Sequence, residues 1–133
     1  MEILERDACL ALLASVPVGR VGVTIDALPA VLPVNFALAG DGAIVFRTVP
    51  GTKLDAATIG AVVAFQADDV CATGDVGAWS VLVRGVAREL TTAADIGVAE
   101  TLPLESWAWQ RGADRFVRIE PTLITGRRVV RPA

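Results

Sequence analysis

The sequence predicts a mainly β domain, either an antiparallel barrel or a sandwich, with short helices added. Six or seven segments rich in β-branched residues follow one another, and turn-length connections separate most of them. The helical segments are too few, and come too late in the chain, to act as crossovers between parallel strands. The Gly-rich fingerprint of dinucleotide-binding folds is also missing. Both observations argue against a doubly wound α/β fold.

The N-terminal part is expected to form a helix followed by strands. Apolar residues and good helix formers run from Glu2 to Ser15, and Val16-Pro17 ends this helix because proline cannot continue it. The segment Asp26-Ala27-Leu28-Pro29 is the turn between the first two strands, and Asp41-Gly42 supplies the positive φ that a tight hairpin needs. The strands expected in this part are 18–25, 30–38 and 43–48.

The C-terminal part is expected to alternate strands with two short helices. The helices are Lys53–Ile59 and Thr91–Glu100, the second capped by one of its leading threonines. Gly85, inside the longest strand, predicts a bulge or a close backbone approach. Glu120-Pro121 predicts a break or bend near the C-terminus. The strands expected here are 61–67, 79–90, 115–119 and 123–130.

Length and composition indicate one domain that associates with another copy. A chain of 133 residues buries roughly two thirds of the surface of its unfolded form, which requires no second domain. A hydrophobic content of 53% and a mean hydropathy of +0.56 leave more apolar surface than one small core hides, so oligomerisation is expected. Nothing approaches the ~20-residue apolar run of a membrane helix, and no secretory signal is apparent, which predicts a cytoplasmic protein.

Charge and residue usage argue against several function classes. A net charge of -3 and a pI near 4.8 disfavour nucleic acid as the main partner, because binding to phosphate backbones needs a concentrated positive face. The only cysteines, Cys9 and Cys71, are far apart, and the chain has no histidine. A metal site, a disulfide scaffold and Ser-His-Asp or Cys-His catalysis are therefore not expected. An enzymatic activity would rely on a cofactor.

The segment Arg47–Lys53, here called the anion turn, is the most informative part of the sequence. Strand-like residues run into a Pro50-Gly51 turn, and Lys53, the only lysine among 12 basic residues, follows it. Backbone N–H groups released by a glycine turn, threonine hydroxyls and one or two cations together suit a phosphate. The alternative is an ordinary lysine at the start of a surface helix, in a chain whose other basic residues are all arginine.

Tryptophans and a C-terminal arginine pair form a second set of candidates. Trp79 and Ser80 follow a glycine loop at the start of the longest strand, Trp107 and Trp109 come later, and Gly126-Arg127-Arg128 lies near the C-terminus. Tryptophan faces suit a flat heteroaromatic ligand. The alternatives are that Trp79 anchors the core, that the later tryptophans cap the barrel or fill a dimer seam, and that the arginines form a solvated strand edge.

Five short motifs occur in a recognisable order and spacing, and they are Leu32–Phe36, Asp41–Thr48, Pro50–Leu54, Trp79–Gly85 and Thr125–Arg128. Together they make the chain resemble the pyridoxamine 5'-phosphate oxidase-like, FMN-binding split-barrel proteins. The resemblance covers nearly the whole chain, and no single motif would suffice for it.

This resemblance implies a six-stranded antiparallel Greek-key split β-barrel, one flavin-binding domain over residues 1–133, and a homodimer with FMN in clefts at its interface. It places Val34–Phe36 along the flavin ring and ribityl chain, and Arg47 and Thr48 near the ring or the ribityl hydroxyls. It assigns the phosphate to Thr52 and Lys53, in agreement with the anion turn. The implied cofactor-binding residues, some contributed by the other subunit, are Val34, Asn35, Phe36, Arg47, Thr48, Gly51, Thr52, Lys53, Trp79, Ser80, Val81 and Arg127.

The chain departs from the authentic oxidases of this family in two places. Those enzymes carry extra arginine and lysine in the strand matching Leu32–Phe36, and an Arg-x-His element near the C-terminus, and this chain has neither. The resemblance therefore implies an FMN-dependent oxidoreductase acting on an unidentified small molecule, without vitamin B6 oxidation. Arg47, Thr48 and Ser80 are candidates for tuning the flavin ring, and no catalytic residue is assigned. The alternatives are a deazaflavin-dependent reductase of the same fold and a non-catalytic flavin-binding, carrier or interaction module.

Overall fold

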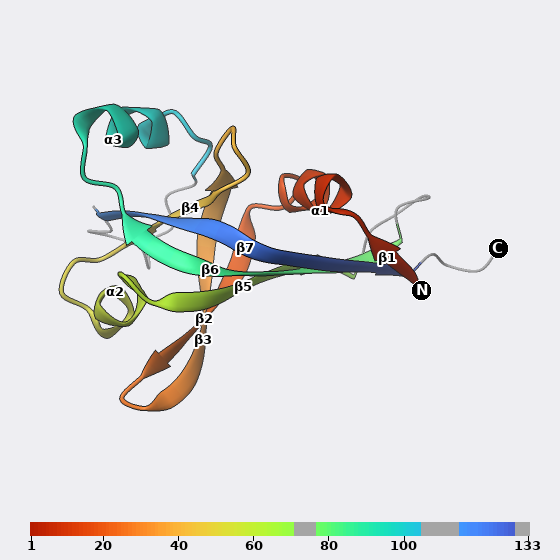
Figure 1. Cartoon of the computed structure of the whole chain (residues 1–133), viewed down its shortest axis with the longest axis horizontal. Coiled ribbons are helices and arrows are strands. Elements are labelled where there is room, and N and C mark those ends of the chain that lie inside the picture. Colours follow the sequence, from red (N-terminus) through yellow and green to blue (C-terminus); the bar gives the residue numbers. More distant parts are fainter. Residues whose placement is uncertain (71–76, 105–114, 130–133) are drawn as a thin grey trace.

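The structure, a computed structural model, describes residues 1–70, 77–104 and 115–129. Its main feature is a strongly curved antiparallel sheet with short helices around it (Figure 1). Within these ranges no helix is long and apolar enough to cross a membrane. The elements in chain order are β1 (Glu2–Leu4), α1 (Arg6–Leu13), β2 (Val18–Ile25), β3 (Leu28–Leu38), β4 (Ile44–Thr48), α2 (Lys53–Thr58), β5 (Val62–Asp69), β6 (Ala78–Glu89), α3 (Ala93–Glu100) and β7 (Arg115–Val129).

The strands β2 to β7 close into a ring. The sheet order is β1-β7-β4-β3-β2-β5-β6, and β6 also pairs with β7, so β1 is the described strand that lies outside the ring. All of these pairings are antiparallel. The mainly β fold predicted from the sequence, a six-stranded antiparallel barrel with short helical additions, is confirmed.

The N-terminal segment does not form the single helix expected over Glu2–Ser15. Glu2–Leu4 is instead strand β1, which pairs with Gly126–Arg128 of β7, and the helix begins at Arg6. An ion pair of 2.7 Å between Glu2 Oε2 and Arg128 Nη2 supports this pairing. β7 extends beyond its pairing with β4, so the edge of its last residues is open to another strand. Main-chain hydrogen bonds with that edge outweigh the weak helix preference of residues 2–4.

The long strands β6 and β7 are irregular where one of them contains a proline. β7 runs continuously through Glu120-Pro121, so the expected break is absent, and the pairing register shifts between Arg84 and Gly85 on β6. Gly85 lies opposite Pro121, and a Cβ on this glycine would overlap the Glu120 carbonyl oxygen. The close backbone approach predicted for Gly85 is therefore confirmed, and the missing N–H of Pro121 falls at a bulge.

The main core lies inside the ring, and a smaller cluster lies outside it. Alternate strand residues point inward, as the pleat requires, and the largest fully buried side chains include Phe46 and Phe65. The smaller cluster forms on the other face of β4 and β7, around Val45, Ala99 of α3 and Phe116. β4 is thus covered on both of its faces until it reaches the anion turn.

β7 connects the anion turn, near its first residues, with Ser80 and Arg127, near its last residues. Its first residues pair with β4, so that Arg115 lies opposite Thr48, and its last residues pair with the start of β6, so that Arg127 lies opposite Ser80. A strand of 15 residues that rises about 3.3 Å per residue spans roughly 45 Å. In Figure 1, α2 and α3 lie at one end of β6 and β7, and β1 lies at the other.

Candidate functional site

The anion turn is a locally closed structure between β4 and α2. Gly51 has a φ of 82°, the left-handed conformation that glycine adopts most readily. Thr52 is the N-cap of α2, and its Oγ1 accepts a hydrogen bond from the Asp55 N–H at 3.2 Å. The same hydroxyl donates to the Val49 carbonyl oxygen at 2.8 Å. The turn therefore holds its shape through its own hydrogen bonds.

A buried carboxylate that the sequence analysis did not single out lies beneath this turn. Asp55 is 6% exposed, its Oδ1 accepts a hydrogen bond from Thr48 Oγ1 at 2.7 Å, and its Oδ2 accepts one from the Gly51 N–H at 3.1 Å. Arg115 Nε on β7 lies 2.9 Å from Asp55 Oδ1, as an ion pair, and Arg115 Nη1 lies 3.0 Å from Glu89 Oε2. The available signal was an acidic residue three positions after a threonine, a spacing related to the capping box.

Arg47, the first residue of the anion turn, packs its guanidinium against an aromatic ring and has a buried Nε. Its side chain is half-buried, and its guanidinium carbon lies 4.7 Å from the centroid of the Phe116 ring. Its Nε is buried and has no hydrogen-bond partner among the residues that the structure describes. A buried donor of this kind costs about 1–3 kcal/mol when it stays unsatisfied. An acceptor atom of a ligand would remove that penalty.

Lys53 lies on the surface, where it contacts the turn between β2 and β3. Its Nζ is 3.0 Å from Asp26 Oδ2, and the two side chains are 78% and 73% exposed. Ion pairs this exposed contribute at most about 1 kcal/mol, so the ammonium group exchanges one anion for another at small cost. Asp26 and Ala27, with φ of 51° and 64°, form the turn expected in this region.

The candidates on β3 are buried beside β4. Val34 and Phe36 belong to the main core and are 1% and 3% exposed, and Asn35 is also buried. Phe36 pairs with Phe46, the residue immediately before Arg47. The strand segment 34–36 therefore lies next to the start of the anion turn, close enough for both to contact one ligand.

The remaining candidates lie at the far end of β7. Trp79 and Val81 point into the core, with 4% and 0% exposed, whereas Ser80 is on the outer face opposite Arg127. Ser80 Oγ accepts a hydrogen bond of 3.1 Å from Gln66 Nε2. A shallow surface hollow, here called the β6–β7 hollow, is lined by Ser80, Leu82, Thr125, Gly126 and Arg127. The candidates Trp107 and Trp109 lie outside the described residues.

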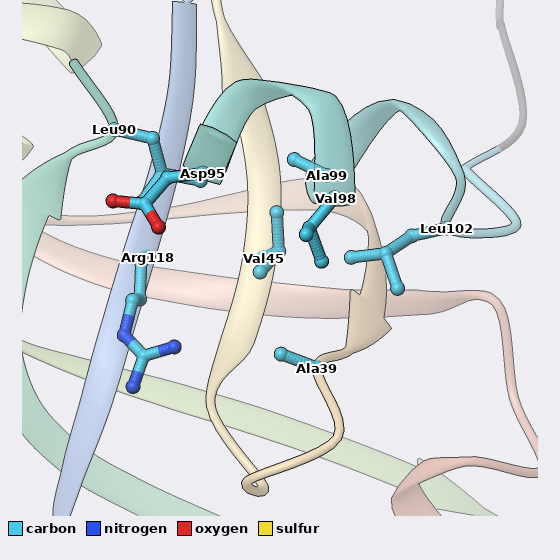
Figure 2. Close-up of a pocket in the computed structure, with 8 residues that line it drawn as sticks. All are labelled: Ala39, Val45, Leu90, Asp95, Val98, Ala99, Leu102 and Arg118. Atoms are coloured by element: carbon cyan, nitrogen blue, oxygen red, sulfur yellow. The ribbon is translucent and has the colours of Figure 1, made fainter. Parts of the chain in front are cut away.

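A small cavity beneath α3 lies against Val45 of β4 and Arg118 of β7 (Figure 2). Its volume is about 170 Å³, and Figure 2 shows Asp95 and Arg118 together at one side of it. Arg118 forms an ion pair with Asp41, and this hydrogen bond lowers the pKa of the aspartate and raises that of the arginine. The cation at the cavity is therefore already neutralised. The full lining is Ala39, Val45, Leu90, Asp95, Val98, Ala99, Leu102 and Arg118.

The structure thus assembles the sequence candidates into two groups rather than one. The turn group combines β3 residues 34–36 with the anion turn, and the far group combines residues 79–81 with Arg127. These groups lie near opposite ends of the same long strand. Within a single chain they do not form one continuous site.

Comparison with known proteins identifies relatives over almost the whole chain. The family model of pyridoxamine 5'-phosphate oxidase matches residues 5–128. The uncharacterized protein Rv0080 of Mycobacterium tuberculosis is 40% identical over 132 residues, which are 96% of this chain and 84% of that protein. The FAD binding protein from Mycobacterium smegmatis is 39% identical, with a TM-score of 0.79 over 98% of this chain and 100% of that one. A Corynebacterium diphtheriae protein of unknown function is 28% identical, with a TM-score of 0.76 over 97% and 98% of the two chains.

Proposed function

Because the chain belongs to the pyridoxamine 5'-phosphate oxidase family, we propose that it is a flavin-dependent oxidoreductase that binds FMN at the anion turn. The proposal rests on the half-buried Arg47, whose buried Nε has no hydrogen-bond partner within the described parts of the chain. A ligand oxygen would satisfy this donor. Lys53, at the end of the same turn, adds a cation that its exposed contact with Asp26 holds only weakly.

The contacts within the anion turn indicate which groups would hold a phosphate. Thr48 Oγ1 and the Gly51 N–H already donate to Asp55, so they shape the site from below. Lys53 and Thr52 are exposed residues, which makes the Lys53 ammonium and the Thr52 hydroxyl the phosphate ligands of the proposal. Thr52 would donate to the phosphate by releasing the Val49 carbonyl oxygen.

The chain's own contribution to an oxidoreductase reaction is binding and electrostatics. FMN, when bound, supplies the transfer of electrons or hydride, which no side chain of this protein provides. Arg47 holds a positive charge against the Phe116 ring, where it favours negative charge on a neighbouring ligand. The buried segment 34–36 gives that ligand a rigid apolar wall.

We further propose that the functional unit is a homodimer with each flavin between two chains. The turn group and the far group are separated by most of the length of β7, roughly 40 Å, which is more than one flavin spans. A second copy would bring its Ser80 and Arg127 to the anion turn of the first. The outer face of the ring also exposes Val31, Val62 and Leu123, at 69%, 73% and 48%, which such a contact would cover.

FAD is a second candidate cofactor, and a specific relative favours it. The Mycobacterium smegmatis protein that is 39% identical to this chain is a FAD binding protein. FAD carries phosphate groups as FMN does, so the anion turn suits either molecule. A deazaflavin remains the third candidate, and its polyanionic tail is less suited to an acidic chain.

Flavin binding is tested by mixing the purified protein with riboflavin, FMN and FAD and following flavin fluorescence. We expect FMN or FAD to bind at least tenfold more tightly than riboflavin, because only the phosphorylated flavins engage Lys53. Lys53→Ala should remove this difference, and Arg6→Ala, which removes an exposed cation from α1, should retain it. A protein that takes up none of these flavins, and no deazaflavin, would refute the proposal. Reduction of the bound flavin by NADH, NADPH or a reduced deazaflavin, followed by turnover of an acceptor, would separate an enzyme from a carrier.

A further inference from the structure

Asp55 is a negatively charged residue at a site that we propose for a negatively charged phosphate. Its carboxylate is buried directly beneath the anion turn, where a negative charge repels a phosphate. We propose that Asp55 is a positioning residue that fixes the anion turn in the shape that receives the flavin phosphate. This inference rests on the proposed function, and it assigns a role to a residue that the sequence analysis did not select.

The directions of the hydrogen bonds resolve the contradiction. Both carboxylate oxygens are occupied from inside the protein, Oδ1 by Thr48 Oγ1 and Oδ2 by the Gly51 N–H. Arg115 lies 2.9 Å from Oδ1 and compensates the charge. The carboxylate therefore offers no free oxygen toward the turn's outer side, and its charge is paired before a phosphate arrives.

The same contacts join three elements around the turn. Thr48 is the last residue of β4, Asp55 is in the first turn of α2, and Arg115 is the first residue of β7. Thr48 and Arg115 are also paired across β4 and β7. Asp55 thus ties the main chain of Gly51 to two strands of the ring. A turn whose main chain is already fixed lowers the ordering cost of binding its ligand.

Asp55→Asn is the variant that tests this role. The amide keeps the size of the side chain, but only one of its two terminal atoms is an acceptor, so it cannot present an oxygen to both the Gly51 N–H and Arg115 Nε, and the ion pair with Arg115 is lost. We expect the affinity for FMN to fall about 10- to 100-fold and the affinity for riboflavin to fall less than about threefold, because a displaced turn affects the phosphate and not the ring. Arg115→Lys, which keeps the charge but loses the Nε contact, should act in the same direction with a smaller effect.

A matched control comes from the other partner of Arg115. Glu89→Gln removes the negative charge that lies 3.0 Å from Arg115 Nη1 and does not touch the hydrogen bonds of the turn. We expect this variant to keep the wild-type preference for FMN over riboflavin. Its stability should be measured with that of Asp55→Asn, so that affinities are compared between folded proteins.

A second measurement on the flavin-free protein tests the contact itself. Because the Gly51 N–H donates to a buried carboxylate, its hydrogen exchange should be slow in the wild type and faster by about tenfold or more in Asp55→Asn. Fast exchange in the wild type would overturn the inference. Equal losses for FMN and riboflavin in Asp55→Asn, with a wild type that prefers FMN, would also overturn it and leave the proposed function intact. A wild type that binds no flavin would refute the proposed function and this role together.

Discussion

The candidate residues at the two ends of β7 differ in how deeply they are buried and in how many contacts they make within one chain. At the anion-turn end, Asp55 is almost fully buried and has partners on β4, the turn and β7. At the other end, Arg127 and Ser80 lie exposed in the shallow β6–β7 hollow. A buried polar network holds one geometry, whereas exposed side chains acquire theirs from what binds them. The anion-turn end therefore has a defined geometry within one chain, whereas in the proposed function the far end acquires its geometry from what binds it.

The largest expected effect comes from disrupting the strand pair that joins these ends. Gly85→Ala would force a Cβ into the Glu120 carbonyl oxygen, and neither backbone can yield without separating β6 from β7. We expect a loss of about 2–4 kcal/mol in the free energy of unfolding, measured by urea denaturation. Gly97→Ala is the control, because nothing lies within 4 Å of its Cβ in α3, and it should be neutral or stabilising by up to about 1 kcal/mol. Equal stabilities for the two variants would show that β6 and β7 are not in close contact there.

A mixture of two variants tests whether the incomplete end is completed by another copy. Lys53→Ala damages the anion-turn end and Arg127→Ala damages the far end, and we expect each alone to lower FMN affinity by about tenfold or more. In a mixed dimer with each site between chains, one site has both residues mutated and the other has neither. Mixing the two variants after partial unfolding should therefore restore tight binding at up to half of the sites in mixed dimers, measured by fluorescence titration.

If the mixture of variants recovers no tight FMN binding, the proposed site between two chains is wrong. Restoration requires that the turn group of one chain and the far group of the other act together. Unchanged weak binding, in a sample that sedimentation shows to contain mixed dimers, would place both residues in one chain's site. A monomer in sedimentation would remove the two-chain site altogether.

The sequence predicted the fold class and the local turns better than it predicted contacts between segments that are distant in the chain. The Pro50-Gly51 turn, the Asp41-Gly42 hairpin and the close approach at Gly85 were predictable because glycine and proline act locally on the backbone. β1 was missed because its strand conformation depends on the free edge of β7, more than a hundred residues further along the chain. Local propensity contains no information about such a partner.

The Asp55 network escaped prediction for a related reason. An aspartate in the first turn of a short helix usually lies on the surface, and nothing local predicts that Arg115 will be adjacent to it. The inward direction of Trp79 was one of two alternatives in the sequence, and only the alternation along β6 resolves it. What the sequence could not provide was therefore the pairing between distant segments, which decides both burial and charge compensation.

The smallest expected effect concerns an exposed ion pair near the anion-turn end, between Asp41 and Arg118. The hydrogen bond from Arg118 lowers the pKa of Asp41 below its ordinary value in the folded protein. The pair therefore stabilises the fold above the pKa of an unfolded aspartate, about 3.9, and this contribution is lost as the pH falls through the lower pKa of the folded state. The Asp41 side chain is 55% exposed, so the contribution at pH 7 should not exceed about 1 kcal/mol.

Asp41→Asn measures this contribution against the buried network at the same end. The variant should lose up to about 1 kcal/mol of unfolding free energy at pH 7, and its difference from the wild type should shrink as the pH falls through the lowered pKa of Asp41, in urea titrations at each pH. Asp55→Asn should lose more at pH 7, because it removes a buried carboxylate that pairs with Arg115 Nε and accepts hydrogen bonds from Thr48 Oγ1 and the Gly51 N–H. Equal losses of unfolding free energy in Asp41→Asn and Asp55→Asn would show that burial does not strengthen the Asp55 contacts. Added salt at pH 7 should weaken the Asp41 contribution and leave that of Asp55 nearly unchanged, since exposed charges are screened and buried ones are not.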